Sequence, residues 1–148
     1  MSQENVEAAK RGYTILNAAY ESGDVNDLLP LAEETWDPDI VLTTSGKRLP
    51  ESGEWRGFQG ILRFTEAQMD AFTQMWVEPL DFIDAGDRLV VPVRVGGQAR
   101  HSGIEIEFPA VHVLTIRDGK ATRLDIFASM EEALEAVGLS EQDAHADS

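Results

Sequence analysis

The chain has 148 residues, and its 27 acidic and 12 basic side chains give a formal net charge of −15 at pH 7. This length suits one domain with its own core, and the charge disfavours nucleic acid and anionic membranes as partners. The chain lacks cysteine, which excludes disulfides and thiolate chemistry. No apolar run approaches the roughly 20 residues that cross a bilayer, and the polar beginning is unlike a signal peptide. We therefore expect a cytoplasmic protein.

The first half of the chain is predicted to be mainly helical. Apolar residues at helical spacing predict an amphipathic helix over residues 3–21 and a shorter helix over 25–34. Asp37-Pro38-Asp39 is expected to form a turn before a strand over 40–44. The following segment, 45–57, holds three glycines and a proline and is expected to be a loop.

A third helix is predicted over 58–73, and strands follow it. Two strands over about 76–84 and 88–96 flank the turn at Asp84–Asp87. A hairpin over about 104–127 comes next, with a tight turn at Arg117-Asp118-Gly119-Lys120. Because these connections are short, the strands must be mainly antiparallel.

A last helix is predicted to begin after Ser129 and to end at Gly138, because Glu132 completes a capping-box pattern. The order of elements indicates an α+β fold. We expect a strongly curved, mainly antiparallel sheet with helices on its concave face enclosing a pocket. Residues 1–139 are predicted to form this single domain, and the acidic tail 140–148 is predicted to be disordered.

The strand before the tight turn carries one histidine, His112, among apolar residues. Side chains alternate across a strand, so His112 shares its face with Phe108, Ala110, Leu114 and Ile116. It either closes a hydrogen bond in the core, to Tyr13, Tyr20 or Thr44, or contacts a ligand as an acid–base group. Burial should lower its pKa and keep the imidazole neutral at pH 7. The three histidines have no metal-ligand spacing, so neither a metal nor another cofactor is expected.

Six stretches, in order along nearly the whole chain, carry a family resemblance: NAAYESGD, DPDIVLTTSG, WRGFQGILRF, FIDAGDRLVVPVRV, HVLTIRDGKATRL and EEALEAVGLSE. The chain resembles the SnoaL-like family of the NTF2-like superfamily, which also contains ketosteroid isomerase. The resemblance implies a cone of curved antiparallel sheet closed by helices. It does not fix the activity, because members include isomerases, polyketide cyclases, hydratases and domains without catalysis.

The catalytic residues of the family transfer poorly onto this sequence. The tyrosine and aspartate base of ketosteroid isomerase fall on Leu16 and Thr44, and its protonated aspartate falls on His112. SnoaL-type cyclases resemble this chain at His112, but their catalytic aspartate falls on Ile126. The neighbouring Asp125 should face the other side of the sheet. Whether Asp125 or Glu78 reaches the pocket stays open.

We predict a protein that binds a small molecule in a mainly apolar pocket containing His112. The predicted wall comprises Tyr13, Leu16, Tyr20, Thr44, Trp55, Met69, Phe72 and Ile126. Trp55, in the glycine-rich loop, is the candidate for a lid. With turnover, the protein would be an isomerase, cyclase or hydratase acting on an apolar carbonyl or hydroxyl compound, with His112 as the catalytic group. The alternative is a non-catalytic ligand-binding or accessory dimerisation module.

The outer face of the sheet, opposite His112, also carries apolar residues: Val90, Pro92, Val111 and Val113. An apolar surface of this kind is unusual on an acidic monomer. We therefore predict a homodimer through this face. Because the two chains repel one another, salt should strengthen the dimer.

Overall fold

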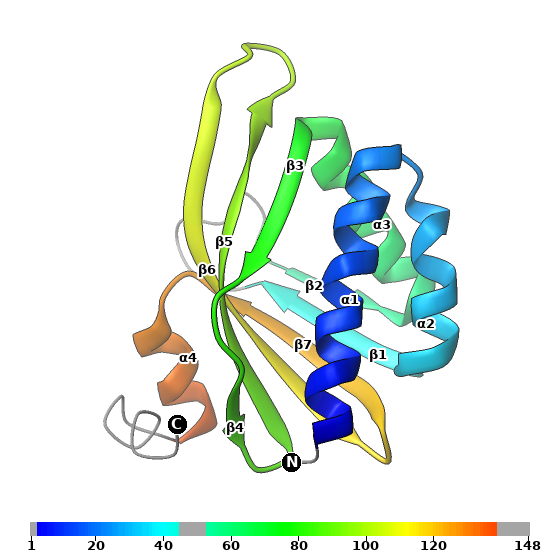
Figure 1. Ribbon diagram of the computed structural model, residues 1–148, viewed down its shortest axis with the longest axis vertical. Helices are drawn as coiled ribbons and strands as arrows, with labels where there is room; N and C mark the ends of the chain where they lie inside the picture. The colour runs from blue at the N-terminus through cyan, green and yellow to red at the C-terminus, as the bar shows by residue number, and fades with distance from the viewer. Residues whose placement is uncertain (1–2, 45–52, 139–148) are drawn as a thin grey trace.

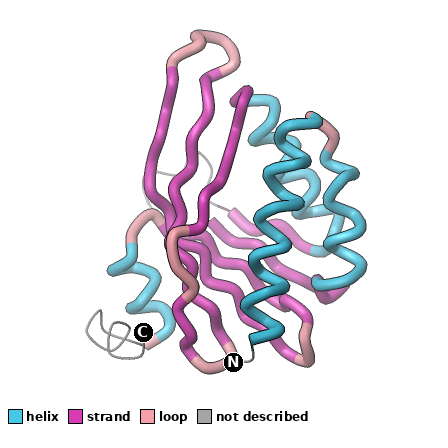
Figure 2. The backbone as a smooth tube through the Cα atoms, in the orientation of Figure 1, coloured by secondary structure: helices cyan, strands magenta, loops and turns pink. Residues whose placement is uncertain are grey.

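The computed structural model describes residues 3–44 and 53–138. Figures 1 and 2 show a long curved sheet with most of the helices on one side of it. The helices on that side are α1 (Gln3–Ser22), the short 3-10 helix η1 (Val25–Leu28), α2 (Leu29–Thr35) and α3 (Gly57–Ala71). The last helix, α4 (Met130–Val137), lies on the opposite side. The expectations for the tail 140–148 concern residues outside those described.

Within the described residues, the sheet contains seven strands: β1 (Trp36–Thr44), β2 (Gly53–Arg56), β3 (Phe72–Pro79), β4 (Ile83–Ala85), β5 (Arg88–Ala99), β6 (Glu105–Arg117) and β7 (Lys120–Phe127). Their order is β2-β1-β7-β6-β5-β3, and β4 pairs with β5. All neighbours are antiparallel except β1 and β7, which are parallel. The predicted α+β class with a mainly antiparallel curved sheet is confirmed. Among the described residues, no helix is long and apolar enough to span a membrane.

The tight turn between β6 and β7 and an irregularity beside it together determine which residues face the helices. Asp118 and Gly119 both have positive φ angles, 52° and 76°, as a two-residue type I′ hairpin turn requires. The turn pairs Arg117 with Lys120, and an irregularity between Thr115 and Ile116 then shifts the register by one residue, so His112 pairs with Ile126 and Val113 pairs with Asp125. His112 and Ile126 consequently share the concave face, and Val113 and Asp125 share the convex face.

Four predicted boundaries were wrong. The expected turn at Asp37–Asp39 lies inside β1, and the expected loop over 45–57 contains strand β2 at its described end. Asp37–Asp39 lie where the pairing of β1 with β7 is irregular, between Trp36 and Val41, whereas strand β2 forms because it pairs with Val41–Thr44 of β1. Such pairing overrides weak local preferences.

The third helix ends two residues earlier than predicted, and the strand expected over 76–84 is divided into β3 and β4. Gln74 has a positive φ of 55° at an irregularity between Thr73 and Trp76. This bulge disrupts the period-two pattern at the beginning of β3, which starts at Phe72 and not at the predicted residue 76.

Helix α1 is fixed to the edge of the sheet by one side chain. The amide of Asn17 donates to the carbonyl oxygen of Val77 at 2.8 Å and accepts from the Val77 N–H at 2.8 Å. Strand β3 is the edge of the sheet, so the amide satisfies groups that would otherwise be unpaired. This arrangement holds α1 across the concave face.

Helix α4 covers the part of the convex face on which the predicted dimer depends. Ser129 caps the helix by accepting from the Glu132 N–H, and Gly138 ends it with a φ of 76°. Its Ala133 and Leu134 pack against a small cluster of strand residues: Ile83, Val90, Val111 and Val113. Since Val90, Val111 and Val113 are buried within one chain, the argument from their exposure was wrong. The homodimer itself stays a prediction.

Candidate functional site

A cavity of about 700 Å³ lies between the concave face of the sheet and helices α1, α2 and α3. Strand β6 contributes its even-numbered side chains, as the alternation predicts: Phe108, Ala110, His112, Leu114 and Ile116. Helix α1 contributes a row of small residues that leave room opposite the sheet: Ala8, Ala9 and Gly12. The wall is mainly apolar, so few polar atoms are available to orient a ligand.

His112 is held in this wall by Tyr13. The Tyr13 hydroxyl lies 2.8 Å from Nδ1 of His112, and the two rings are stacked with centroids 5.8 Å apart. Both side chains are 8% exposed. Phe82 meets the Tyr13 ring edge-on at 6.2 Å, which further restricts the tyrosine. One nitrogen of the imidazole is therefore fixed by the protein.

Burial keeps both partners neutral at pH 7. It lowers the pKa of His112 from 6.5 to about 4 and raises the pKa of Tyr13 well above its ordinary value. A neutral imidazole carries its proton on one nitrogen only. If Nδ1 carried it, the Tyr13 proton would need another acceptor, and none of the described residues supplies one. The balanced arrangement has Tyr13 donating to Nδ1, so Nε2 carries the proton.

The Nε2–H group of His112 is open to the cavity. It has no hydrogen-bond partner among the described residues. Within the same described ranges, no fully enclosed side-chain nitrogen or oxygen lacks a partner. Because His112 lines the cavity, Nε2 must retain access to it. The site therefore presents a neutral N–H donor on an apolar wall.

Five predicted wall residues line the cavity together with His112: Tyr13, Leu16, Tyr20, Phe72 and Ile126. Three others lie elsewhere. Thr44 is buried at the end of β1, where its hydroxyl accepts from the Gly53 N–H at 3.1 Å. Trp55 lies in β2 and packs edge-on against Phe64 with centroids 4.9 Å apart. Trp55 is thus a support behind the wall, and the rest of its predicted lid, 45–52, lies outside the described residues.

The third residue, Met69, lies in the seam between helices. Helix α3 lines the cavity with Ile61, Phe64, Thr65 and Gln68, which recur at helical spacing. Met69 is one residue beyond Gln68 and so points about 100° away from that stripe. It packs with Ala19 and Leu62 instead. The periodicity identified the helix, but the position of its cavity stripe was set by packing.

The sequence interpretation missed several wall residues, chiefly Trp36, Phe64, Thr65, Gln68 and Leu124. The spacing of residues 61, 64, 65 and 68 was a usable signal for α3. The small residues on one side of α1 were a second usable signal, because a wide cavity needs small side chains opposite the sheet. Trp36 gave no local signal, because its position follows from the pairing of β1 with β7.

The carboxylates in question do not approach His112. Asp125 accepts from the Thr43 hydroxyl and from Arg123 Nε at 3.0 Å, on the convex side. Glu78 is exposed on β3, opposite Arg94 of β5. Within the described ranges, the acidic residues that line the cavity are Glu105 and Glu107, and both are exposed. The described residues also contain no cluster of three or more histidine or acidic side chains suited to a metal.

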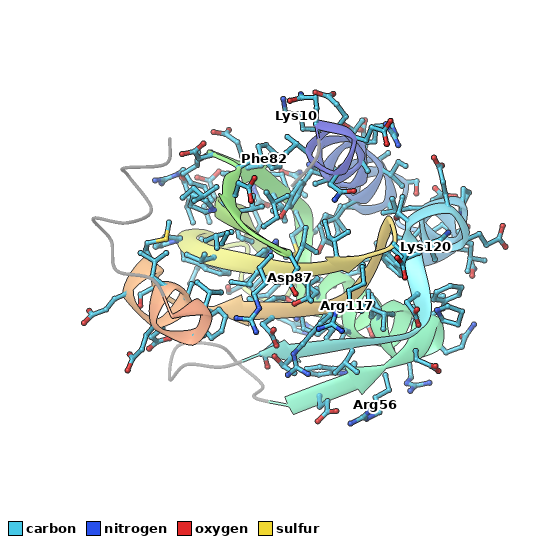
Figure 3. All side chains as sticks on the ribbon, turned by 90° about the horizontal axis from the view of Figure 1, so that it is seen from below. Lys10, Arg56, Phe82, Asp87, Arg117 and Lys120 are labelled. Atoms are coloured by element: carbon cyan, nitrogen blue, oxygen red, sulfur yellow. The ribbon has the colours of Figure 1, made fainter. Side chains whose placement is uncertain are left out.

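One end of the cavity lies near the start of α1 and the β6–β7 turn, where Asn5 and Gly119 line it. Figure 3 views the molecule from below, with Lys10 beside Phe82 and Lys120 beside α2. Lys120 Nζ donates to the carbonyl oxygens of Glu33 and Glu34 at 3.3 and 2.6 Å. These carbonyls lie in the last turn of α2, where a cation is favourable. This contact ties the hairpin turn to the helix layer.

Comparison with known proteins agrees with this architecture. A protein-family model described as SnoaL-like domain matches residues 14–124. Crystallised TerC, whose structure includes polyporic acid, is 24% identical with a TM-score of 0.66, covering 92% of this chain and 99% of TerC. No curated protein matches the chain significantly.

Two further solved structures share the fold. A putative SnoaL-like polyketide cyclase from Jannaschia sp. CCS1 is 18% identical with a TM-score of 0.70, covering 95% of this chain and 97% of the other. An NTF2-like protein of unknown function from Burkholderia pseudomallei is 21% identical with a TM-score of 0.67, covering 93% and 98%. At such low identities, these likenesses establish the fold alone.

Proposed function

We infer the function from the cavity itself, because the chain belongs to the SnoaL-like domain family, whose fold is shared by proteins of many activities. We propose that the cavity binds an apolar small molecule. The observation that carries the proposal is the neutral Nε2–H donor of His112 on a mainly apolar wall. The ligand would therefore present an acceptor oxygen, as a carbonyl or hydroxyl group does. Burial of its apolar frame would supply most of the affinity, and the donor would orient it.

A binding role requires less of His112 than catalysis does. With a pKa near 4, the imidazole is a weak base at pH 7. The carboxylates on the described wall, Glu105 and Glu107, are exposed. Donation of one hydrogen bond needs neither a strong base nor an inward carboxylate. We therefore favour a non-catalytic ligand-binding protein.

Turnover is the second candidate, because a neutral N–H donor in a dry cavity also polarises a carbonyl group. An isomerase-, cyclase- or hydratase-type reaction of an apolar carbonyl compound would use His112 in this way. Such a reaction would require proton abstraction beside the carbonyl, for which the described wall has no strong base. Exchange of the protons beside a bound ketone with solvent therefore distinguishes turnover from binding alone.

The first experiment compares two ligands of the same two-ring frame. 4-Acetylbiphenyl carries one acceptor oxygen, and 4-ethylbiphenyl carries none. We expect calorimetry to give the ketone an affinity about fivefold higher, which corresponds to one hydrogen bond of about 1 kcal/mol. In His112→Phe this preference should fall. Equal affinities of the wild-type protein for the two compounds would contradict the proposal.

Two controls make the result specific. Leu114→Met alters the same strand face without removing a polar atom, so the preference for the ketone should persist. Proton NMR of 4-acetylbiphenyl in D₂O with the wild-type protein then tests turnover. Binding alone predicts no His112-dependent exchange of the acetyl protons. An exchange rate that falls in His112→Phe would favour the catalytic candidate instead.

A further inference from the structure

The cavity contains a second uncommitted donor, the hydroxyl of Tyr20 on α1. Burial raises the pKa of Tyr20 far above its ordinary value of 10, so the hydroxyl is surrounded by protein. The side chain nevertheless keeps some accessible surface and lines the cavity. Its hydroxyl has no hydrogen-bond partner among the described residues, although every fully enclosed polar side-chain atom among them has one. The accessible surface of this hydroxyl therefore borders the cavity.

The spacing of Tyr13 and Tyr20 on α1 sets the scale of the separation between the two donors, because Tyr13 holds His112. Tyr13 and Tyr20 are seven residues apart, so their Cα atoms are about 10 Å apart and lie on nearly the same side of the helix. Tyr13 fixes His112, and Leu16 lines the cavity between the two tyrosines. Along this line, the wall thus has a hydrogen-bond donor at each end and an apolar surface between them. A compact ligand would satisfy one donor and leave the other unpaired.

We infer that the ligand is an elongated apolar molecule with two acceptor oxygens on the order of 10 Å apart, one held by His112 Nε2–H and the other by the Tyr20 hydroxyl. This inference rests on the proposed binding function and specifies its ligand class as dicarbonyl-type compounds with a rigid frame. Tyr20 is then a specificity-determining residue that selects ligands by length.

The test extends the biphenyl series by one compound, 4,4′-diacetylbiphenyl, which carries a carbonyl group at each end. The symmetrical compound gains up to about twofold from statistics alone, since either end fits a single donor. In the wild-type protein 4-acetylbiphenyl can also place its carbonyl at either donor, so the statistical factor cancels. The second hydrogen bond adds about fivefold, so the wild-type protein should bind 4,4′-diacetylbiphenyl about fivefold tighter than 4-acetylbiphenyl. A gain of twofold or less would overturn the inference.

Tyr20→Phe removes only the hydroxyl oxygen and should reduce the gain to twofold or less, while 4-acetylbiphenyl should still bind tighter than 4-ethylbiphenyl because His112 Nε2–H remains. Gln68→Met is the matched control, because Gln68 lines the same cavity from α3. A gain that persists in Tyr20→Phe, or disappears only in Gln68→Met, would overturn the assignment to Tyr20. Thermal unfolding checks that each variant is folded.

Failure of the inference is distinguishable from failure of the proposed function. If 4-acetylbiphenyl binds the wild-type protein no tighter than 4-ethylbiphenyl, the His112 donor is not used and the proposed function fails. If the first ketone is preferred but the second adds nothing beyond twofold, only the two-donor inference fails. The three compounds thus report on the two donors separately.

Discussion

His112 and Val113 are neighbours on β6, yet they belong to two different environments. Val113 is 2% exposed beneath α4, where Ala133 and Leu134 of the same chain pack against it. His112 is 8% exposed and borders a cavity of about 700 Å³ on the other face. One strand therefore separates a filled face from a hollow one. Side-chain packing stabilises the first face, and the second leaves space for a ligand.

The polar side chains of the two faces also differ in how they are satisfied. On the convex face, the Asp125 carboxylate accepts from Arg123 Nε and from the Thr43 hydroxyl. On the concave face, His112 and Tyr13 are kept neutral by burial. Charged groups need partners or water, whereas neutral donors remain in an apolar cavity at lower cost. We infer that stability depends mainly on the convex face and recognition on the concave one.

The largest expected effect contrasts two leucines. Leu134→Ala removes a side chain that is 2% exposed in the filled face, so it should create a new cavity and cost about 2–4 kcal/mol of unfolding free energy. Leu16→Ala enlarges a cavity that already exists, so the cost should be about half as large. Urea denaturation measures both. Equal losses would remove the distinction between the two faces.

The pH dependence of stability should come largely from His112 in the weakly acidic range. Above pH 6.5 the imidazole is neutral in the folded and unfolded states. Between pH 6.5 and about 4, the unfolded state takes up a proton that the folded state does not. Stability should therefore fall as the pH falls through this window, by on the order of 3 kcal/mol in all.

Denaturant unfolding of the wild-type protein and of His112→Phe at several pH values isolates this contribution. The difference between the two proteins should change steadily between pH 6.5 and 5, where most carboxylates are still ionised. A constant difference would mean that His112 titrates normally. Affinity for 4-acetylbiphenyl should stay constant from pH 8 to 6.5, because the donor keeps its proton.

The concave face of β6 and β7 was predictable because its signals are local. The alternation of Phe108, Ala110, His112 and Leu114 gave the face, and Asp118-Gly119 gave the turn. The register of β7 also depends on an irregularity between Thr115 and Ile116. The partnership of His112 with Tyr13 was one of three alternatives. Only the packing of α1 across the sheet selected it, through contacts such as Asn17 with Val77.

The convex face was not predictable from the same signals. Val111 and Val113 indicated an apolar surface, but nothing local indicated that α4 would return to cover it. A short helix with a capping box packs wherever its apolar side meets a matching surface, so its place is a long-range property. Met69 shows a corresponding limit within a helix. The apolar pattern predicted the helix, but the predicted cavity-facing position was off by one residue, and Met69 lies in the seam between helices.

The smallest expected effect concerns Asp125, the carboxylate nearest in sequence to the cavity residue Ile126. Asp125→Asn keeps the shape and an acceptor for Thr43 but removes the charge beside Arg123. Since the Arg123–Asp125 pair is partly exposed, the loss in stability should be at most about 1 kcal/mol. Because Asp125 faces away from the cavity, the pKa of His112 and the preference for 4-acetylbiphenyl should not change. An NMR titration of His112 in both proteins checks this. A fall in the pKa of His112 on loss of the carboxylate would place that charge in contact with the imidazole, and would end the separation of the two faces.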